Sequence, residues 1–108
     1  GHLTGKYLAD PAAPGRLTQW PAFGQRYGKP NVVPAVTAYA ALAKRHGLTL
    51  TQLALGFVRS RWFVGSAIIG ASSLAQLQET LPATRTPVAG ELLSEIDAIH
   101  LRYTNPAP

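Results

Sequence analysis

Cysteine is missing from this sequence of 108 residues, so neither a disulfide framework nor a cysteine-based zinc site can form. Its three histidines stand at positions 2, 46 and 100, without the spacing of metal ligands. No apolar run approaches the ~18 residues of a membrane-spanning helix, and the N-terminal residues lack the features of a secretory signal. We therefore expect no metal site and no membrane partner, and a cytoplasmic location.

Charge is also scarce, at 14% of residues against about 25% in ordinary globular domains. The shortage suggests that the chain buries more surface than it can cover alone. The charge is uneven, since residues 1–62 carry a net +7 and residues 63–108 a net −2. An electropositive half can attract phosphate groups, whether of a nucleotide or of a nucleic acid, and it can equally be a solvated face.

Residues 1–31 are rich in glycine and proline and show neither a strand nor a helix period. We expect a long loop here, and such loops commonly bind ligands. Residues 32–64 follow with two predicted helices. The first begins near Val32 and ends before Gly47. The second is predicted to begin after Thr49, because Thr49 and Gln52 have the spacing of a capping box.

Residues 65–70 close an apolar, glycine-bounded run that is typical of a buried strand. A helix is predicted over 73–81, where Ser73 with Gln76 repeats the spacing of a capping box and Pro82 ends the helix. A last helix is predicted over 90–103. A single strand cannot satisfy its own backbone groups. The sequence therefore indicates an incomplete α/β architecture.

The junction from the expected strand into the helix at Ser73 has small side chains and free amide groups. This geometry lets an anion approach the backbone, as at the carboxyl ends of strands in parallel α/β folds. The same residues also suit an ordinary tight turn, so the junction alone does not distinguish an anion-binding site from such a turn.

Three segments in order resemble the aldo-keto reductase family. Residues 1–7 (GHLTGKY) are similar to the motif after the family's seventh strand, and residues 66–72 (SAIIGAS), continued by Gln76 and Glu79, to its eighth strand and following helix. Residues 43–55 and the closing helix also fit. The resemblance covers essentially the whole chain, and the most similar branch includes the potassium-channel β-subunits and related bacterial reductases.

The resemblance implies that the chain is the C-terminal part of a (β/α)8 TIM barrel, which needs ~250 residues in all. It implies NADP(H) as cofactor, with residues 1–31 as a loop on the cofactor side. The implied cofactor-binding residues lie in that loop and around the last strand and its helix: Lys6, Arg16, Gly70, Ser72, Gln76 and Glu79. Lysine and arginine suit phosphate groups.

Two departures limit what the chain can do alone. Thr80 stands where the family usually has an asparagine for the adenine ring, and threonine lacks the paired donor and acceptor of an amide. The family's catalytic tyrosine, aspartate, lysine and histidine come from earlier strands, so no catalytic residue is expected here. We expect this chain alone to be inactive in reducing aldehydes or ketones to alcohols.

Two other functions remain open from the sequence. One is a non-catalytic module that senses a nucleotide or binds a partner protein. The other is a small basic helical domain that binds nucleic acid, which is disfavoured because no aromatic residues are interleaved with the charges in a recognisable recognition helix. We expect a small carbonyl compound as the substrate of the complete enzyme, no nucleic-acid partner, and self-association through exposed barrel surface.

Overall fold

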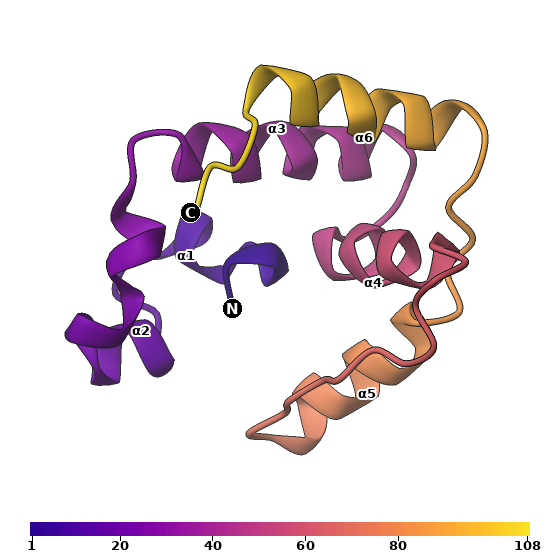
Figure 1. Ribbon diagram of the computed structural model, residues 1–108. Helices are drawn as coiled ribbons and strands as arrows, with labels where there is room; N and C mark the ends of the chain where they lie inside the picture. Colours follow the sequence, from indigo (N-terminus) through magenta and orange to yellow (C-terminus); the bar gives the residue numbers. More distant parts are fainter.

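Helices provide all the regular structure of the protein, which a computed structural model describes over residues 1–108. Four are single turns or 3₁₀ segments near the N-terminus, and four are longer α-helices (Figure 1). In chain order they are η1 His2–Thr4, α1 Lys6–Ala9, α2 Arg16–Gln19, η2 Pro21–Gly28, α3 Val32–Arg45, α4 Leu50–Ser60, α5 Leu74–Ala83 and α6 Glu91–Arg102.

Helix α3 is the centre of the molecule, since α6 packs along one side of it and α4 along the other (Figure 1). Apolar residues recur along α3 at helical spacing, and Leu42 is fully buried. The core holds nine buried side chains from α3, α4, α6 and the segment before α6: Val32, Val36, Leu42, Ala43, Leu50, Leu53, Val88, Leu92 and Ile96.

Local signals in the sequence set the ends of the central helices. The predicted capping box at α4 is confirmed, because the Thr49 hydroxyl accepts from the Gln52 amide at 3.1 Å and the Gln52 side chain accepts from the Thr49 amide at 2.8 Å. Gly47, at φ 66°, supplies the left-handed residue after α3, a conformation that glycine adopts without the Cβ penalty. The predicted helices at 32–46 and 90–103 form as α3 and α6.

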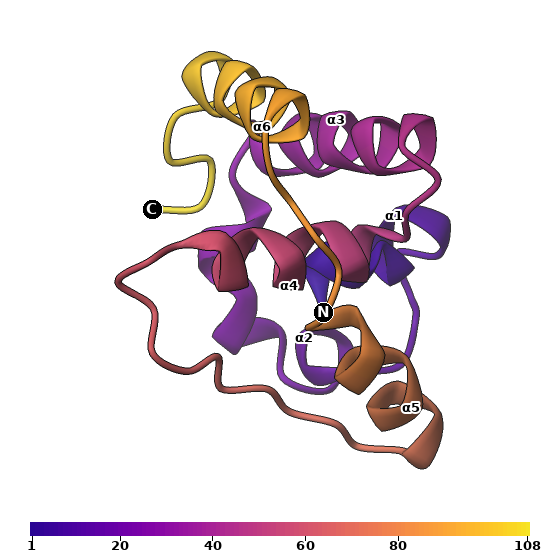
Figure 2. The same ribbon diagram turned by 90° about the vertical axis from the view of Figure 1, so that its right-hand side faces the viewer.

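The strand predicted at 65–70 does not form. Residues 61–73 run without regular structure from α4 to α5, and the backbone groups of 65–71 make no hydrogen bond with other backbone (Figure 2). Ile68 is fully exposed. A strand exists only when a neighbouring strand accepts and donates its ladder of hydrogen bonds, and no other segment of this chain forms one. The α/β class is therefore not seen in these 108 residues.

The expectation of a loop over 1–31 is wrong in its local structure, because η1, α1, α2 and η2 occupy most of it. Single turns are too short to show a 3.6-residue period, so hydrophobic spacing cannot reveal them. Gly5, at φ 79°, joins η1 to α1. The segment is a string of turns that packs against α3 and α4.

Helix α5 also extends beyond its predicted end, since Pro82 lies inside it and Ala83 is its last residue. Proline in the last turn removes only one intrahelical bond, so the helix continues through Pro82 and ends two residues beyond its predicted end. Ala83 is the only buried residue of α5, and α5 packs against α4.

The accessible surface of the whole chain is large for its mass. It measures 7404 Å², whereas a folded monomer of 11.5 kDa exposes about 5800 Å² by the usual scaling of area with mass. Only 14 residues are buried. None of the helices has the length and apolar composition needed to cross a membrane.

Candidate functional site

Lys6 and Arg16 each begin a single helical turn. Lys6, the first residue of α1, donates from Nζ to the carbonyl oxygen of Pro14 at 3.0 Å, and the same atom lies 4.8 Å from the centre of the Tyr7 ring. A Cβ on Gly15 would collide with Lys6 Nζ and the Tyr7 hydroxyl. Glycine at position 15 thus lets the lysine fold back over the turn.

Arg16, the first residue of α2, is exposed, and its guanidinium carbon lies 5.2 Å from the centre of the Phe23 ring. Lys6 Nζ lies against Gly15, the residue directly before Arg16. Both cations therefore act on one small region. Neither forms an ion pair with a carboxylate, so the region can accept an anion.

Ser72 and Gln76 form a second group at the start of α5. The Ser72 amide and hydroxyl both donate to Gln76 Oε1, at 2.9 and 3.1 Å, while the Ser73 hydroxyl accepts from the Gln76 amide at 3.3 Å. The side chain of Gln76 thus caps Ser72 rather than the Ser73 amide that a capping box predicts. A ligand that used the Ser72 donors would have to displace Gln76 Oε1.

The remaining residues predicted around α5 make few contacts. Gly70 is exposed, and a Cβ built on it would have no atom within 4 Å. Glu79 is exposed and forms no ion pair. The Thr80 hydroxyl donates to the Gln76 carbonyl oxygen at 2.6 Å, so it is occupied within the helix and does not replace an amide that faces outward.

The two groups are not brought together. In Figures 1 and 2 the start of α5 lies apart from α1 and α2, and the substantial contacts of α5 are with α4 alone. The segment between α4 and α5 has no strand to fix its direction. The structure therefore unites Lys6 with Arg16 and Ser72 with Gln76, but not one pair with the other.

Among the tyrosines, Tyr39 has an altered acidity. Burial, and then the charge of Asp97, raise the pKa of Tyr39. A tyrosine that donates a proton in catalysis needs the opposite shift, which a neighbouring cation provides. Tyr39 therefore does not have the environment of a general acid. No three histidine, aspartate or glutamate side chains are grouped to hold a metal ion.

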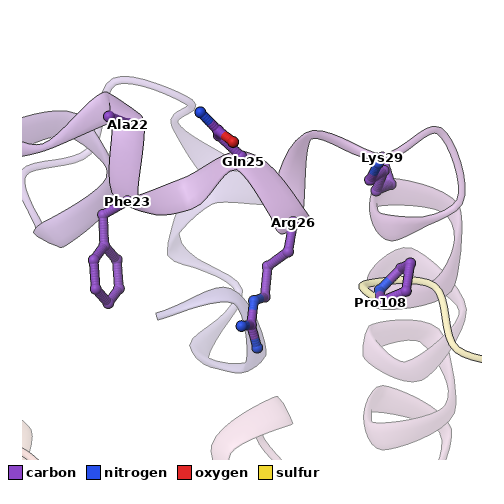
Figure 3. Close-up of a pocket in the computed structure, with 6 residues that line it drawn as sticks. All are labelled: Ala22, Phe23, Gln25, Arg26, Lys29 and Pro108. Atoms are coloured by element: carbon purple, nitrogen blue, oxygen red, sulfur yellow. The ribbon is translucent and has the colours of Figure 1, made fainter.

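Sequence reasoning did not single out a basic cavity on η2. The cavity has a volume of about 380 Å³ and is lined by six residues: Ala22, Phe23, Gln25, Arg26, Lys29 and Pro108 (Figure 3). The signal was present in the sequence, because no aspartate or glutamate occurs from residue 11 to residue 78. Cations in such a stretch have no carboxylate nearby in the chain.

Comparison with known proteins gives consistent matches. The model of the aldo/keto reductase family matches residues 1–101. Protein tas of Escherichia coli (strain K12) is 43% identical over 110 residues, which cover 100% of this chain and 31% of that protein, and its namesake in Shigella flexneri matches equally. An aldo-keto reductase of Babesia bovis is 34% identical over 111 residues, covering 98% of this chain and 39% of that protein. The chain thus spans about a third of the length of these relatives.

Proposed function

This chain belongs to the aldo/keto reductase family, and we propose that it is the cofactor-binding C-terminal part of an NADP(H)-dependent reductase of aldehydes and ketones. In that enzyme it would form the last portion of a (β/α)8 barrel. The observation that carries the proposal is the pair of cations, Lys6 and Arg16, which are unpaired with any carboxylate and lie at the same turn, since Lys6 Nζ lies against Gly15, the residue directly before Arg16.

Lys6 and Arg16 suit the phosphates of a dinucleotide. Lys6 already directs its ammonium group at a carbonyl oxygen, which shows that it can reach an acceptor across the turn at Gly15. Arg16 offers a planar fork for two phosphate oxygens. Both charges would hold the diphosphate and the adenosine side of the cofactor.

The residues around α5 suit the 2′-phosphate end. Ser72 presents an amide and a hydroxyl that converge on one acceptor, now Gln76 Oε1. A phosphate oxygen could take that acceptor's place, with the amides at the start of α5 nearby. Gly70 leaves room for the approach, and Gln76 and Glu79 would line the adenosine. Thr80 is bound within its helix, so it would add little to adenine binding.

The bound cofactor would supply the hydride that reduces a small carbonyl substrate. The residues of this chain would hold and orient the cofactor. Proton donation would come from residues outside this chain, as the resemblance to the family implies. We accordingly expect binding of NADPH without turnover by the 108 residues alone.

A fluorescence titration with NADPH tests the proposal. The substitutions Lys6→Gln and Arg16→Gln should each weaken NADPH binding about tenfold, the value of one charge-assisted hydrogen bond. Arg59→Gln, which removes an exposed cation from α4, is the matched control and should have no effect. NADH should bind more weakly than NADPH, and Ser72→Ala should reduce that difference.

Three results would redirect the interpretation. Equal binding by the Lys6 and Arg16 variants and the wild type would refute the assignment of these residues. NADPH binding without turnover in the complete polypeptide would favour a nucleotide-sensing module. Binding of DNA or RNA that weakens steeply with salt, with no affinity for NADPH, would favour the nucleic-acid function.

A further inference from the structure

The cavity on η2 has a cationic lining that no protein group neutralises. Arg26 lies in η2 and Lys29 directly follows it, and both line the cavity (Figure 3). Both side chains are exposed, and neither makes an ion pair or a side-chain hydrogen bond. Two cations that share a cavity repel each other, and a bound anion removes that repulsion.

The cavity is open to solvent, and its size leaves room for more than a bare ion. Its volume of about 380 Å³ falls near the lower end of the ~300–1,000 Å³ that small-molecule sites occupy. The Phe23 ring extends from η2 in the same direction as the Arg26 side chain (Figure 3). An aromatic wall beside a guanidinium fork suits a ligand with a planar or apolar part next to its charge.

We propose that this cavity binds a small phosphate monoester. Arg26 and Lys29 hold the phosphate group, the arginine through two parallel N–H donors and the lysine as a point charge. Phe23 contacts the carbon part of the ligand. The site is distinct from the proposed cofactor site, whose cations belong to α1 and α2.

Phe23 is the link between the two sites, because Arg16 approaches the same ring at 5.2 Å. The experiment must therefore separate a phosphate monoester bound at Arg26 and Lys29 from the phosphates of a dinucleotide bound at Lys6 and Arg16. Phenyl phosphate is a suitable probe, since it combines a phosphate with an aromatic ring. Inorganic phosphate reports on the charged part alone.

Calorimetric titration of the intact chain with phenyl phosphate tests the proposal. The double variant Arg26→Gln/Lys29→Gln should bind the probe at least about tenfold more weakly than the wild type. The control Arg59→Gln/Arg85→Gln removes the same charge from exposed positions outside the cavity and should bind as the wild type does. Circular dichroism confirms that all the variants keep their helices. Equal affinity of the double variant and the wild type would overturn the proposal.

Two further measurements test the role of Phe23 and the separation of this site from the cofactor site. Phe23→Leu should weaken the binding of phenyl phosphate and leave that of inorganic phosphate unchanged; an equal effect on both would remove Phe23 from the site. NADPH should not displace phenyl phosphate, and Lys6→Gln should not weaken it. Displacement together with loss in the Lys6 variant would show that the probe occupies the cofactor site, and the proposal of a separate site would then be wrong.

Discussion

Gly56 allows the loop before α6 to pack closely against α4. It lies within α4, and the loop before α6 crosses directly over it. A Cβ at this position would lie 2.6 Å from Val88 Cγ2 and 2.7 Å from the Thr86 carbonyl oxygen. Val88 belongs to the core, so the absence of a side chain at Gly56 allows the loop to reach α4.

Replacing Gly56 with alanine should destabilise the protein by about 1–3 kcal/mol, the usual cost of overpacking a core. The higher helix propensity of alanine, about 1 kcal/mol, opposes this cost but cannot move the backbone oxygen of Thr86. Urea unfolding followed by circular dichroism would measure the difference. Gly65→Ala is the control, because nothing lies within 4 Å of a Cβ there. An unchanged midpoint for Gly56→Ala would contradict the packing described.

Residues with local partners were predictable from the sequence. Thr49 and Gln52 are three residues apart and satisfy each other's backbone, so their spacing was sufficient. Gln76 was only partly predictable, since its amide bonds Ser73 as expected while its side chain bonds Ser72. The contact of Arg16 with Phe23 could not be predicted, because it depends on how two short turns fold together.

At the scale of elements, the contact of α3 with α6 includes a polar clasp outside the core. Glu95 of α6 accepts from Arg45 Nη2 through one carboxylate oxygen, and its other oxygen lies at hydrogen-bond distance from His46 Nε2. The interaction with His46, and then that with Arg45, lower the pKa of Glu95. The clasp connects residues that are about 50 positions apart in the chain.

The clasp should make stability depend on pH in the acidic range. Because the pKa of Glu95 is lower in the folded state, the unfolded chain binds more protons near pH ~4, and stability rises with pH there. The contribution is present above about pH 4.5 and is lost as the pH falls through the lowered pKa. Urea midpoints measured from about pH 6 to about pH 3 would reveal it.

Glu95→Gln should flatten that acidic slope and reduce the midpoint at neutral pH. Glu79→Gln is the matched control, since Glu79 is exposed and unpaired on α5. If the Glu95 variant kept the full slope of the wild type, the clasp would not contribute to stability. Added salt should weaken the effect in the wild type, because the clasp is near the surface.

Long helices were predictable and the strand was not, for a physical reason. A helix such as α3 satisfies its backbone hydrogen bonds internally. The spacing of its apolar residues and the glycine after its last turn are therefore enough to predict where it forms and ends. The segment over 65–70 has the composition of a strand, yet its hydrogen bonds require a second strand. The relation of Lys6 to Ser72 depends on that same missing pairing, which explains why the predicted cofactor residues fall into two groups.

The whole molecule exposes apolar side chains that a monomer normally buries. The total surface exceeds the value for a monomer of this mass by roughly 1,600 Å², about twice the ~800 Å² that each partner buries in an ordinary protein interface. Trp62 is 94% exposed, and Phe63, Ile68 and Leu74 are also exposed. All four belong to the segment from the end of α4 to the start of α5. This is the surface through which we expect the chain to associate.

The isolated chain should form dimers or larger species as its concentration rises, as sedimentation velocity would detect. Ile68→Lys should shift the equilibrium toward the monomer without loss of stability, because Ile68 is fully exposed. Leu101→Lys changes an exposed leucine on α6 and should leave association unaffected. A chain that sediments as a monomer at all concentrations would refute this prediction.

Ala83, at the C-terminal end of α5, is the only buried residue of that helix, so the helix is anchored mainly at this end. Its 10 residues span about 15 Å, so a tilt of about 10° around Ala83 would displace the Ser73 end by about 2.6 Å, nearly the length of a hydrogen bond. The donors of Ser72 are carried at that distant end. A ligand that binds these donors must therefore also fix the orientation of α5, and the cost of doing so reduces the free energy of binding.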